Sequence, residues 1–270
     1  MFSFKSLAEN KNAPLIMGIL NITPDSFSDG GEADSLSSAL ERLNKLYEDG
    51  ADIIDIGACS TAPNNTIISV EEELRRLEIL PELVKHSRVP LSIDTLRPQV
   101  ARYALECGVA IVNDESGCFN PEMAAAVKEL GAGWIFMHTG GKGSREVAEY
   151  PNGVVNHVCE FFDNMKKQAL DFGINEECLC YDCGIGFGKS RNDDLELLKS
   201  CKVLSARSPL LVGVSRKRVI GEITGQQSPR DRVAGSVAAV LCCAINGAGV
   251  LRVHDVKETV DALKVAYILL

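Results

Sequence analysis

Short apolar runs recur along this chain, and each is followed by a polar residue, a loop and a pattern of apolar residues at helical spacing. The first run ends at Asn21, and apolar residues at helical spacing then continue as far as Gly50, which ends the expected helix. A short apolar run between loops is typical of a buried strand. The expected strands cover residues 15–20, 53–56, 90–93, 109–112, 134–137, 179–181, 210–214 and 250–253.

This alternation of strands and helices predicts the fold class, α/β. Eight parallel strands that are buried on both faces, each followed by a helix, close into a (β/α)8 barrel, or TIM barrel. No linker or change in composition divides the chain, so we expect a single domain over residues 1–270. The alternative, an open doubly wound sheet, would need a glycine fingerprint after the first strand, and the sequence has none there.

Several helix boundaries can be predicted from single residues. Ser69 and Glu72 have the spacing of a capping box, and Pro81 is expected to interrupt the helix that follows. Pro121 has the character of a first helical residue. A long apolar helix is expected over residues 230–246, and Gly247 ends it.

Composition and charge narrow the class of partners. The net charge of −9 argues against a nucleic-acid surface and against attraction to anionic membranes, although a local cluster of Lys and Arg can still bind an anionic substrate. No apolar run is long enough to cross a membrane, and the first residues lack the apolar core of a signal peptide. We therefore expect a cytoplasmic protein.

The ten cysteines are scattered through apolar segments, which favours reduced, buried thiols over a disulfide framework. Cys178, Cys180 and Cys183 are close enough in sequence to raise the hypothesis of a metal site. A second Cys or His pair at zinc-like spacing is missing, so this hypothesis is the weaker one.

Polar side chains follow every expected strand. In a (β/α)8 barrel the carboxyl ends of the strands meet at one face, which carries the active site. Asp55 and Asn113 could instead cap helices or tie loops together, but the set as a whole predicts one polar site. Its members are Asn21, Asp55, Asp94, Asn113, His138, Asp182, Lys217, Arg252 and His254.

The residue types in this set indicate the ligand. Carboxylates and an amide at Asp94, Asn113 and Asp182 suit a planar heterocycle with a row of N–H donors, each charged hydrogen bond contributing roughly 1.5–3 kcal/mol. Lys217 can donate to a ring carbonyl, and the guanidinium of Arg252 can stack on the ring.

The segment from Gly18 to Gly31 is the least generic part of the chain. It runs from an apolar strand into a loop that carries an amide, hydroxyls, two carboxylates and the aromatic Phe27. Such hard oxygen ligands suit Mg²⁺, which prefers few protein ligands together with phosphate oxygens. Together with Arg252 and His254, this loop is expected to hold a diphosphate.

Taken together, these segments resemble the dihydropteroate synthase family. The matching blocks span nearly the whole chain in the family's order: residues 18–31, 52–57 with Ser60-Thr61, 91–95, 111–114, 137–138, 182–189, 213–217 and 252–256. The resemblance implies that 4-aminobenzoate displaces diphosphate from 6-hydroxymethyl-7,8-dihydropterin diphosphate, which gives 7,8-dihydropteroate for folate synthesis. It also implies Mg²⁺ as cofactor, a homodimer, and sulfonamides as competing inhibitors.

The resemblance also implies a role for each matching residue. The catalytic residues would be Lys217, Arg252, Asp29 and Phe27. The pterin would be bound by Asp94, Asn113, Met137, Asp182, Lys217 and Arg252. The diphosphate would be bound by Asn21, Arg252 and His254, and the magnesium ion by Asn21 and Asp29. The aminobenzoate site would be framed by Phe27, Thr61, Pro63, Phe187, Ser215 and Lys217.

The chain departs from the family pattern at several positions, of which three change the chemistry of the side chain. The second loop of the family usually reads Gly-Gly-Glu-Ser-Thr-Arg-Pro, and here Cys59 replaces the glutamate and Ala62 the arginine. Cys183 replaces the proline that usually follows the pterin-binding aspartate. We therefore expect altered affinity for aminobenzoate or sulfonamide, with pterin binding retained. The alternatives on the same barrel are a pterin-dependent methyltransferase, which acts on a corrinoid, and a non-catalytic pterin-binding module.

Overall fold

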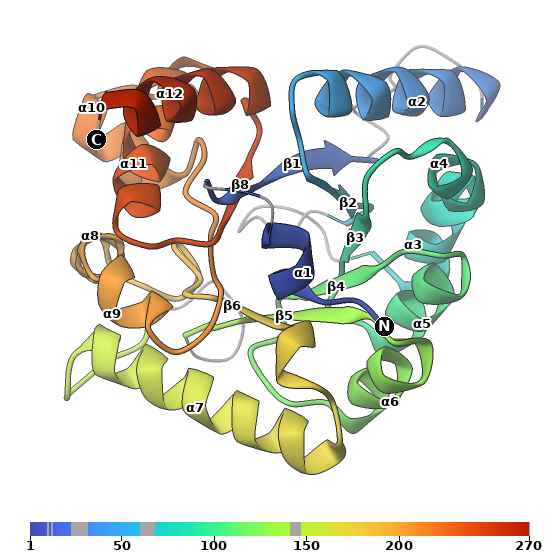
Figure 1. Ribbon diagram of the computed structural model, residues 1–270, viewed down its shortest axis with the longest axis horizontal. Helices are drawn as coiled ribbons and strands as arrows, with labels where there is room; N and C mark the ends of the chain where they lie inside the picture. Colours follow the sequence, from blue (N-terminus) through green and yellow to red (C-terminus); the bar gives the residue numbers. More distant parts are fainter. Residues whose placement is uncertain (10, 12, 23–31, 60–67, 141–146, 270) are drawn as a thin grey trace.

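In the computed structural model, which describes residues 1–9, 11, 13–22, 32–59, 68–140 and 147–269, the strands form a closed barrel (Figure 1). Each strand pairs in parallel with the next in sequence, and β8 pairs with β1. The predicted (β/α)8 barrel is therefore confirmed. The strands are β1 (Leu15–Asn21), β2 (Ile53–Gly57), β3 (Leu91–Asp94), β4 (Ile111–Asp114), β5 (Gly133–Met137), β6 (Leu179–Asp182), β7 (Leu210–Val212) and β8 (Val250–Val253).

Helices surround the strands as an outer ring (Figure 1). The α-helices are α1 (Phe4–Ala8), α2 (Glu32–Glu48), α3 (Val70–Arg76), α4 (Leu80–His86), α5 (Pro98–Glu106), α6 (Pro121–Leu130), α7 (Val154–Phe172), α8 (Arg191–Lys199), α9 (Cys201–Ser205), α10 (Arg218–Thr224), α11 (Val233–Ile245) and α12 (Val256–Leu269). The short 3₁₀ turns are η2 (Leu77–Ile79), η3 (Glu176–Cys178) and η4 (Pro229–Arg232).

The interior of the barrel is apolar toward the amino ends of the strands. Inward-facing side chains from seven strands form one buried cluster there, with Phe4 of α1 among them. The sequence analysis did not anticipate α1, which lies across the middle of the ring in Figure 1 and closes this end of the barrel. The strand residues of the cluster are Leu15, Met17, Ile53, Ile111, Ile135, Cys180, Leu211 and Val250.

Most of the predicted helix and strand boundaries hold to within two residues. Pro81 lies in the first turn of α4, directly after η2, and so interrupts the helix as expected. Pro121 opens α6, where the side chain of Asn120 accepts hydrogen bonds from two backbone N–H groups. The long apolar helix starts later than expected, at Val233, because η4 occupies residues 229–232. Strand β7 ends at Val212, two residues earlier than expected.

The ten cysteines are all free, as the sequence predicted, but not all are buried, since Cys118 and Cys242 are exposed and Cys59 and Cys107 are half-buried. Cys180 points into the barrel interior, Cys183 packs in the layer between strands and helices, and Cys178 donates its thiol to the carbonyl oxygen of Phe2 at 3.0 Å. Because these three side chains point in different directions, they form no metal site, and that hypothesis is wrong. None of the helices in the described ranges is long and apolar enough to span a membrane.

Candidate active site

Strand register brings polar side chains together at the carboxyl end of the barrel. Paired positions run from Asn21 through Gly57 and Asp94 to Asn113 across β1 to β4. Met137 is paired with Asp182 across β5 and β6. Because these residues share one end of a closed barrel, the predicted site forms from segments that are far apart in sequence.

Arg252 lies at the centre of this group. Its Nε donates to Asp55 Oδ2 at 2.6 Å, and its Nη2 donates to Asp94 Oδ2 at 2.5 Å. Asn113 also donates to Asp55 Oδ2, at 3.1 Å. The side chain of Asp55 is completely buried and that of Arg252 is 15% exposed, so the pair is held largely away from water. Asp55 therefore accepts hydrogen bonds from both Arg252 and Asn113 and fixes the positions of their side chains.

The side chains of Asp182 and Lys217 approach each other at the mouth of the barrel, where the charge of Lys217 acts on the carboxyl group of Asp182. A Cβ at Gly213 would lie 3.7 Å from Asp182 Oδ2 and 3.9 Å from Lys217 Nζ, so both side chains converge on this glycine. Asp182 Oδ1 accepts the backbone N–H of Gly184 at 2.7 Å. Lys217 Nζ donates to the carbonyl oxygen of Ile185 at 2.6 Å and lies 4.7 Å from the ring centre of Phe187.

Burial shifts the protonation equilibria of these groups. Burial, and then the charge of Glu115, raises the pKa of Asp94 well above its ordinary value, and burial likewise raises the pKa of Asp182. Burial lowers the pKa of Lys217. Burial also opposes the charge of Arg252, but Asp55 and Asp94 outweigh it and raise the pKa of that guanidinium. Glu115 was not among the predicted site residues, because nothing in the local sequence pattern indicates that it lies near the site.

The loop after β7 turns through an unusual backbone conformation. Arg216 has a φ of 59°, the only positive φ of a non-glycine residue in the described ranges. A left-handed residue with a Cβ costs about 1–2 kcal/mol. Here the backbone N–H of Arg216 donates to Ser236 Oγ at 2.8 Å, and its guanidinium holds the carboxylate of Asp255. The sequence did not predict a role for this residue, which lies between Ser215 and Lys217 and is fixed by these contacts.

A cavity of about 500 Å³ opens beside this loop. His254 lies in its lining, with Nδ1 3.1 Å from Ser215 Oγ, and the backbone N–H of His254 donates to the same hydroxyl at 3.2 Å. Desolvation within the cavity, followed by the charge of Arg252, lowers the pKa of His254 to about 4, although part of its side chain stays exposed to solvent. At neutral pH its imidazole is therefore uncharged. The cavity is lined by Ile19, Gly213, Ser215, Arg216, Lys217, Ser228, Pro229, Arg230, Arg252 and His254.

His138 does not belong to this group, so that part of the prediction is wrong. Its neighbour Met137 occupies the last position of β5, and the ring of His138 packs outside the barrel against His157 and Phe161 of α7, with centroid distances of 5.2 and 5.1 Å. Burial, followed by the charge of Lys189, lowers the pKa of His138 to about 3.

Lys189 joins the loops after β5 and β6. Its buried ammonium group donates to the carbonyl oxygens of His138, Gly184 and Phe187 at 3.1, 2.9 and 3.0 Å. Gly184 has a φ of +67°, and a Cβ there would collide with the carbonyl oxygen of His138. These contacts give Lys189 and Gly184 a structural role, and they fix the loop that carries Phe187.

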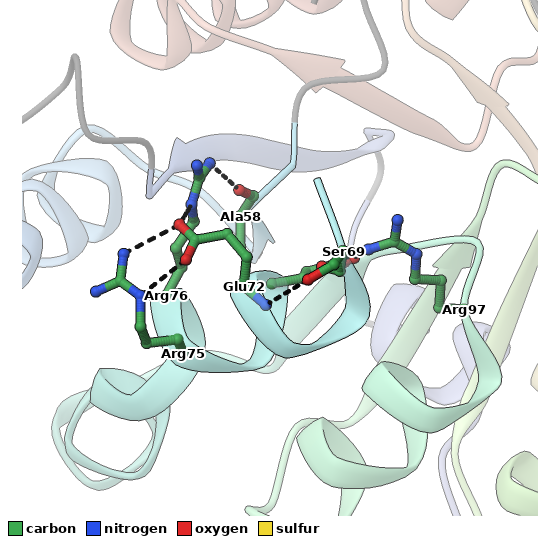
Figure 2. Close-up of polar contacts among 7 residues, drawn as sticks. Ala58, Ser69, Glu72, Arg75, Arg76 and Arg97 are labelled. Atoms are coloured by element: carbon green, nitrogen blue, oxygen red, sulfur yellow. Dashed lines mark hydrogen bonds and ion pairs between the residues drawn. The ribbon is translucent and has the colours of Figure 1, made fainter. Parts of the chain in front are cut away.

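The loop between β2 and α3 is held at both of its described ends. Arg76 Nη1 donates to the carbonyl oxygen of Ala58 at 3.0 Å, just beyond β2 (Figure 2). Arg97 Nη1 donates to the carbonyl oxygen of Ser69 at 3.1 Å, just before α3. Both arginines therefore anchor the segment in which the family pattern changes.

The expected capping box at the start of α3 forms only in part. Ser69 Oγ accepts the backbone N–H of Glu72 at 3.2 Å, as predicted (Figure 2). The Glu72 carboxylate accepts from Arg75 and Arg76 at 2.8 and 2.7 Å, and within the described chain it does not accept the backbone N–H of Ser69. Glu72 therefore serves to position Arg76 on the loop.

Asn21 is the one predicted metal ligand within the described residues, and its surroundings suit the ion. Its Oδ1 lies 3.3 Å from the position that a Cβ would take at Gly57, and Asp94 Oδ2 lies 3.8 Å from the same position. One amide oxygen is a suitable protein ligand for Mg²⁺, which takes most of its other ligands from water and phosphate. No cluster of three or more His, Cys, Asp or Glu side chains able to hold a metal occurs in the described ranges. Phe27, Asp29, Thr61 and Pro63 lie outside the described residues, so their roles stay predictions.

Comparison with known proteins gives consistent matches. The family model described as "Pterin binding enzyme" matches residues 17–254. The chain is 40% identical over 256 residues to the dihydropteroate synthase of Synechocystis sp., covering 93% of this chain and 88% of that protein.

Solved structures agree with this relationship. The dihydropteroate synthase of Xanthomonas albilineans with 4-aminobenzoic acid has a TM-score of 0.88 and 43% identity, covering 96% of this chain and 93% of that one. The Yersinia pestis dihydropteroate synthase in complex with a sulfonamide drug has a TM-score of 0.87 and 35% identity, covering 95% of this chain and 94% of that one.

Proposed function

Since the chain belongs to the pterin-binding enzyme family and its relatives are dihydropteroate synthases, we infer that it catalyses the dihydropteroate synthase reaction. It condenses 6-hydroxymethyl-7,8-dihydropterin diphosphate with 4-aminobenzoate, releases diphosphate and forms 7,8-dihydropteroate for folate synthesis. The observation that carries this conclusion is a family match over residues 17–254, which contains every side chain of the polar site.

Pterin binding is assigned to the groups deep in the mouth of the barrel. Asp182 has one oxygen fixed by Gly184 and the other directed toward Gly213, where it can accept N–H donors of the ring. Asn113 and Asp94 offer further polar atoms at the same level, and Lys217 can donate to the ring carbonyl. Met137 packs beside Asp182 as an apolar wall.

Diphosphate is assigned to Arg252, His254 and Asn21. The imidazole of His254 is uncharged and hydrogen-bonded through Nδ1 to Ser215, so its other nitrogen can face a phosphate oxygen. Asn21, together with Asp29, would hold Mg²⁺, which neutralises charge on a diphosphate leaving group when it is bound. Arg252 contributes a guanidinium that is fixed in place by its two carboxylates.

These assignments need no nucleophilic side chain. The bond between the methylene carbon and the diphosphate oxygen breaks, and its electron pair leaves with the diphosphate. The amine nitrogen of 4-aminobenzoate forms the new C–N bond and releases a proton to solvent. The pterin ring is electron-rich and lies beside the Asp94 and Asp182 carboxylates, so it can stabilise a positive methylene before the amine attacks.

The aminobenzoate site is assigned to the outer part of the mouth, where sulfonamides also compete. Phe187 and Lys217 lie together there, with Nζ above the ring. Ser215 is close by, although its hydroxyl is already bonded to His254. Phe27, Thr61 and Pro63 complete the proposed site.

Two further properties belong to the proposal. The outer face of α11 and α12 exposes large apolar side chains, including Ile245 at 51% and Val265 at 59%, which supports a homodimer through this face. Sedimentation would show it, since a monomer at micromolar concentration contradicts the proposal. Ten free cysteines support a reducing, cytoplasmic location.

One assay tests the function. The purified full-length chain receives both substrates and Mg²⁺, and release of diphosphate and formation of dihydropteroate are measured in the same reaction. Equal amounts of the two products are expected. Pterin binding without turnover would instead indicate a binding module, and methyl transfer to a corrinoid would indicate a methyltransferase.

A further inference from the structure

The cavity beside the β7 loop contains five basic side chains. They are Arg216, Lys217, Arg230, Arg252 and His254. A diphosphate brings several negative charges into this space. Its affinity therefore depends on how many basic groups carry a positive charge that no protein carboxylate already compensates. Four of the five are either paired with groups of the protein or uncharged at neutral pH.

The first two are arginines already paired with carboxylates. Arg252 donates to both Asp55 and Asp94. Arg216 forms a two-point contact with Asp255, with Nε 3.0 Å from one carboxylate oxygen and Nη2 bonded to the other. Each guanidinium can still donate a hydrogen bond, but its charge is largely compensated by its partner.

The next two are Lys217 and His254. Lys217 donates to the carbonyl oxygen of Ile185, lies over the ring of Phe187 and faces the charge of Asp182. His254 is uncharged at neutral pH and is bonded through Nδ1 to Ser215. Neither therefore supplies a free positive charge to the cavity.

Arg230 is different. It lies in η4, it is exposed, and it has no hydrogen bond or ion pair with any residue that the structure describes. Arg232, two residues later, shows the contrast, because its guanidinium donates to the carbonyl oxygens of Gln226, Gln227 and Arg216. Arg230 is thus the lining cation without a compensating group in the described chain.

We propose that Arg230 binds the diphosphate of the pterin substrate in this cavity, whose lining it shares with Arg252. This rests on the proposed function. The planar guanidinium can donate two parallel hydrogen bonds to phosphate oxygens. As the bond to the methylene carbon breaks, the electron pair moves onto the departing diphosphate, and Arg230 stabilises the added charge.

The test compares Arg230→Ala and Arg230→Lys with Arg42→Ala, which removes the same charge from the exposed surface of α2. Steady-state kinetics give the KM for each substrate. Calorimetry with inorganic diphosphate and Mg²⁺ gives an affinity that does not depend on turnover. A thermal melt of each variant confirms folding.

For Arg230→Ala we expect kcat/KM for the pterin diphosphate to fall about tenfold, the size of one arginine–phosphate contact at a partly exposed site. Inorganic diphosphate should bind about tenfold more weakly for the same reason. The KM for 4-aminobenzoate should change less than twofold, Arg230→Lys should recover part of the loss, and Arg42→Ala should match the wild type.

Two results would overturn the proposal: unchanged diphosphate affinity in Arg230→Ala, or an equal loss in Arg42→Ala. A rise confined to the KM for 4-aminobenzoate would also overturn it and move Arg230 to the other substrate. If the wild-type chain makes no dihydropteroate, the proposed function fails, but the calorimetric comparison still decides whether Arg230 holds diphosphate.

Discussion

The two ends of the barrel interior are built from the same strands and differ completely in chemistry. Toward the amino ends, inward side chains such as Met17, Ile111 and Ile135 form a dry cluster closed by Phe4. Two positions further along the same strands, the inward side chains include Asn113 and Met137, and the neighbouring strands supply Asp94, Asp182 and Arg252.

This difference assigns the stability of the fold to one end of the barrel and its activity to the other. At the apolar end, burial of side chains stabilises the folded state and serves no ligand. At the other end, burial raises the pKa of Asp182 and lowers that of Lys217. Burial of these charged groups therefore reduces the stability of the folded state. A substitution at the polar end should therefore affect activity far more than stability, and the reverse should hold at the apolar end.

The largest effect is expected for Asp182→Asn. The amide keeps the shape but loses the charge that would accept pterin N–H donors, so kcat/KM should fall about a thousandfold, as expected for the loss of two charged hydrogen bonds. Because burial already disfavours the ionised carboxylate, the melting temperature should stay the same or rise. Steady-state kinetics and a thermal melt measure both quantities.

Asp114→Asn is the matched control, because Asp114 is a buried carboxylate at the end of β4 whose side chain points outward. It accepts from Trp134 Nε1 at 3.2 Å and from the backbone N–H of Ser116 at 2.9 Å. Kinetics within twofold of the wild type are expected. Equal losses of activity in Asp182→Asn and Asp114→Asn would remove the distinction between inward and outward carboxylates.

At the apolar end, Ile135→Ala should lower the free energy of unfolding by about 2–5 kcal/mol, because the completely buried side chain leaves a cavity. Urea unfolding measures this loss, with Ile135→Val as a smaller step of the same kind. The kcat/KM per folded molecule should stay within twofold of the wild type. A large loss of kcat/KM at normal stability would show that the two ends are coupled.

His138→Phe tests the outer face of the barrel at the end of β5, where the side chain should affect stability and not activity. The folded state keeps His138 neutral, with a pKa of about 3, whereas the unfolded chain takes up a proton near pH 6.5. The unfolded state therefore gains stability as the pH falls below 6.5. Phenylalanine cannot take up this proton. The free energy of unfolding of the variant, relative to that of the wild type, should therefore increase by about 2 kcal/mol between pH 7 and pH 5.

Urea unfolding at the two pH values measures the difference between His138→Phe and the wild type. His86→Phe, at an exposed position on α4, is the control because it removes an imidazole that water already solvates. Activity at pH 7 should persist in His138→Phe. A difference that does not change with pH would show that the protonated ring is accommodated between β5 and α7.

His138 also shows where the sequence is insufficient. The barrel and most of its polar ring could be predicted, because each apolar run is followed by a polar residue and parallel strands bring those ends together. Strands buried on both faces carry no alternation, however, so the sequence does not say which of Met137 and His138 points inward. The structure shows that Met137 ends β5 and faces the site.

Long-range partners were the second limit. Arg252 could be predicted as a site residue, but its bonds to Asp55 and Asp94 join segments 197 and 158 residues apart. The left-handed conformation of Arg216 depends on Ser236 and Asp255, which no local pattern connects to it. Such contacts require the closed barrel, and a single sequence does not supply them.

The smallest effect is expected in the second loop, where the sequence departs from the family. Its described ends at Ala58 and Ser69 are held by Arg76 and Arg97, so a substitution between them leaves the anchors in place. Ala62→Arg restores a cation, and the KM for 4-aminobenzoate and the inhibition constants of sulfonamides should fall about fivefold, as for an exposed ion pair of about 1 kcal/mol.

Ala62→Met is the control for this change, because it adds a long side chain without charge. The KM for the pterin diphosphate should stay constant in both variants, since the groups proposed to bind it lie deep in the mouth of the barrel around Asp94 and Asp182. Michaelis and inhibition constants that match the wild type in Ala62→Arg would mean that the lost arginine does not matter here. The polar end would then owe its aminobenzoate affinity to groups fixed by the barrel itself, such as Phe187 and Lys217.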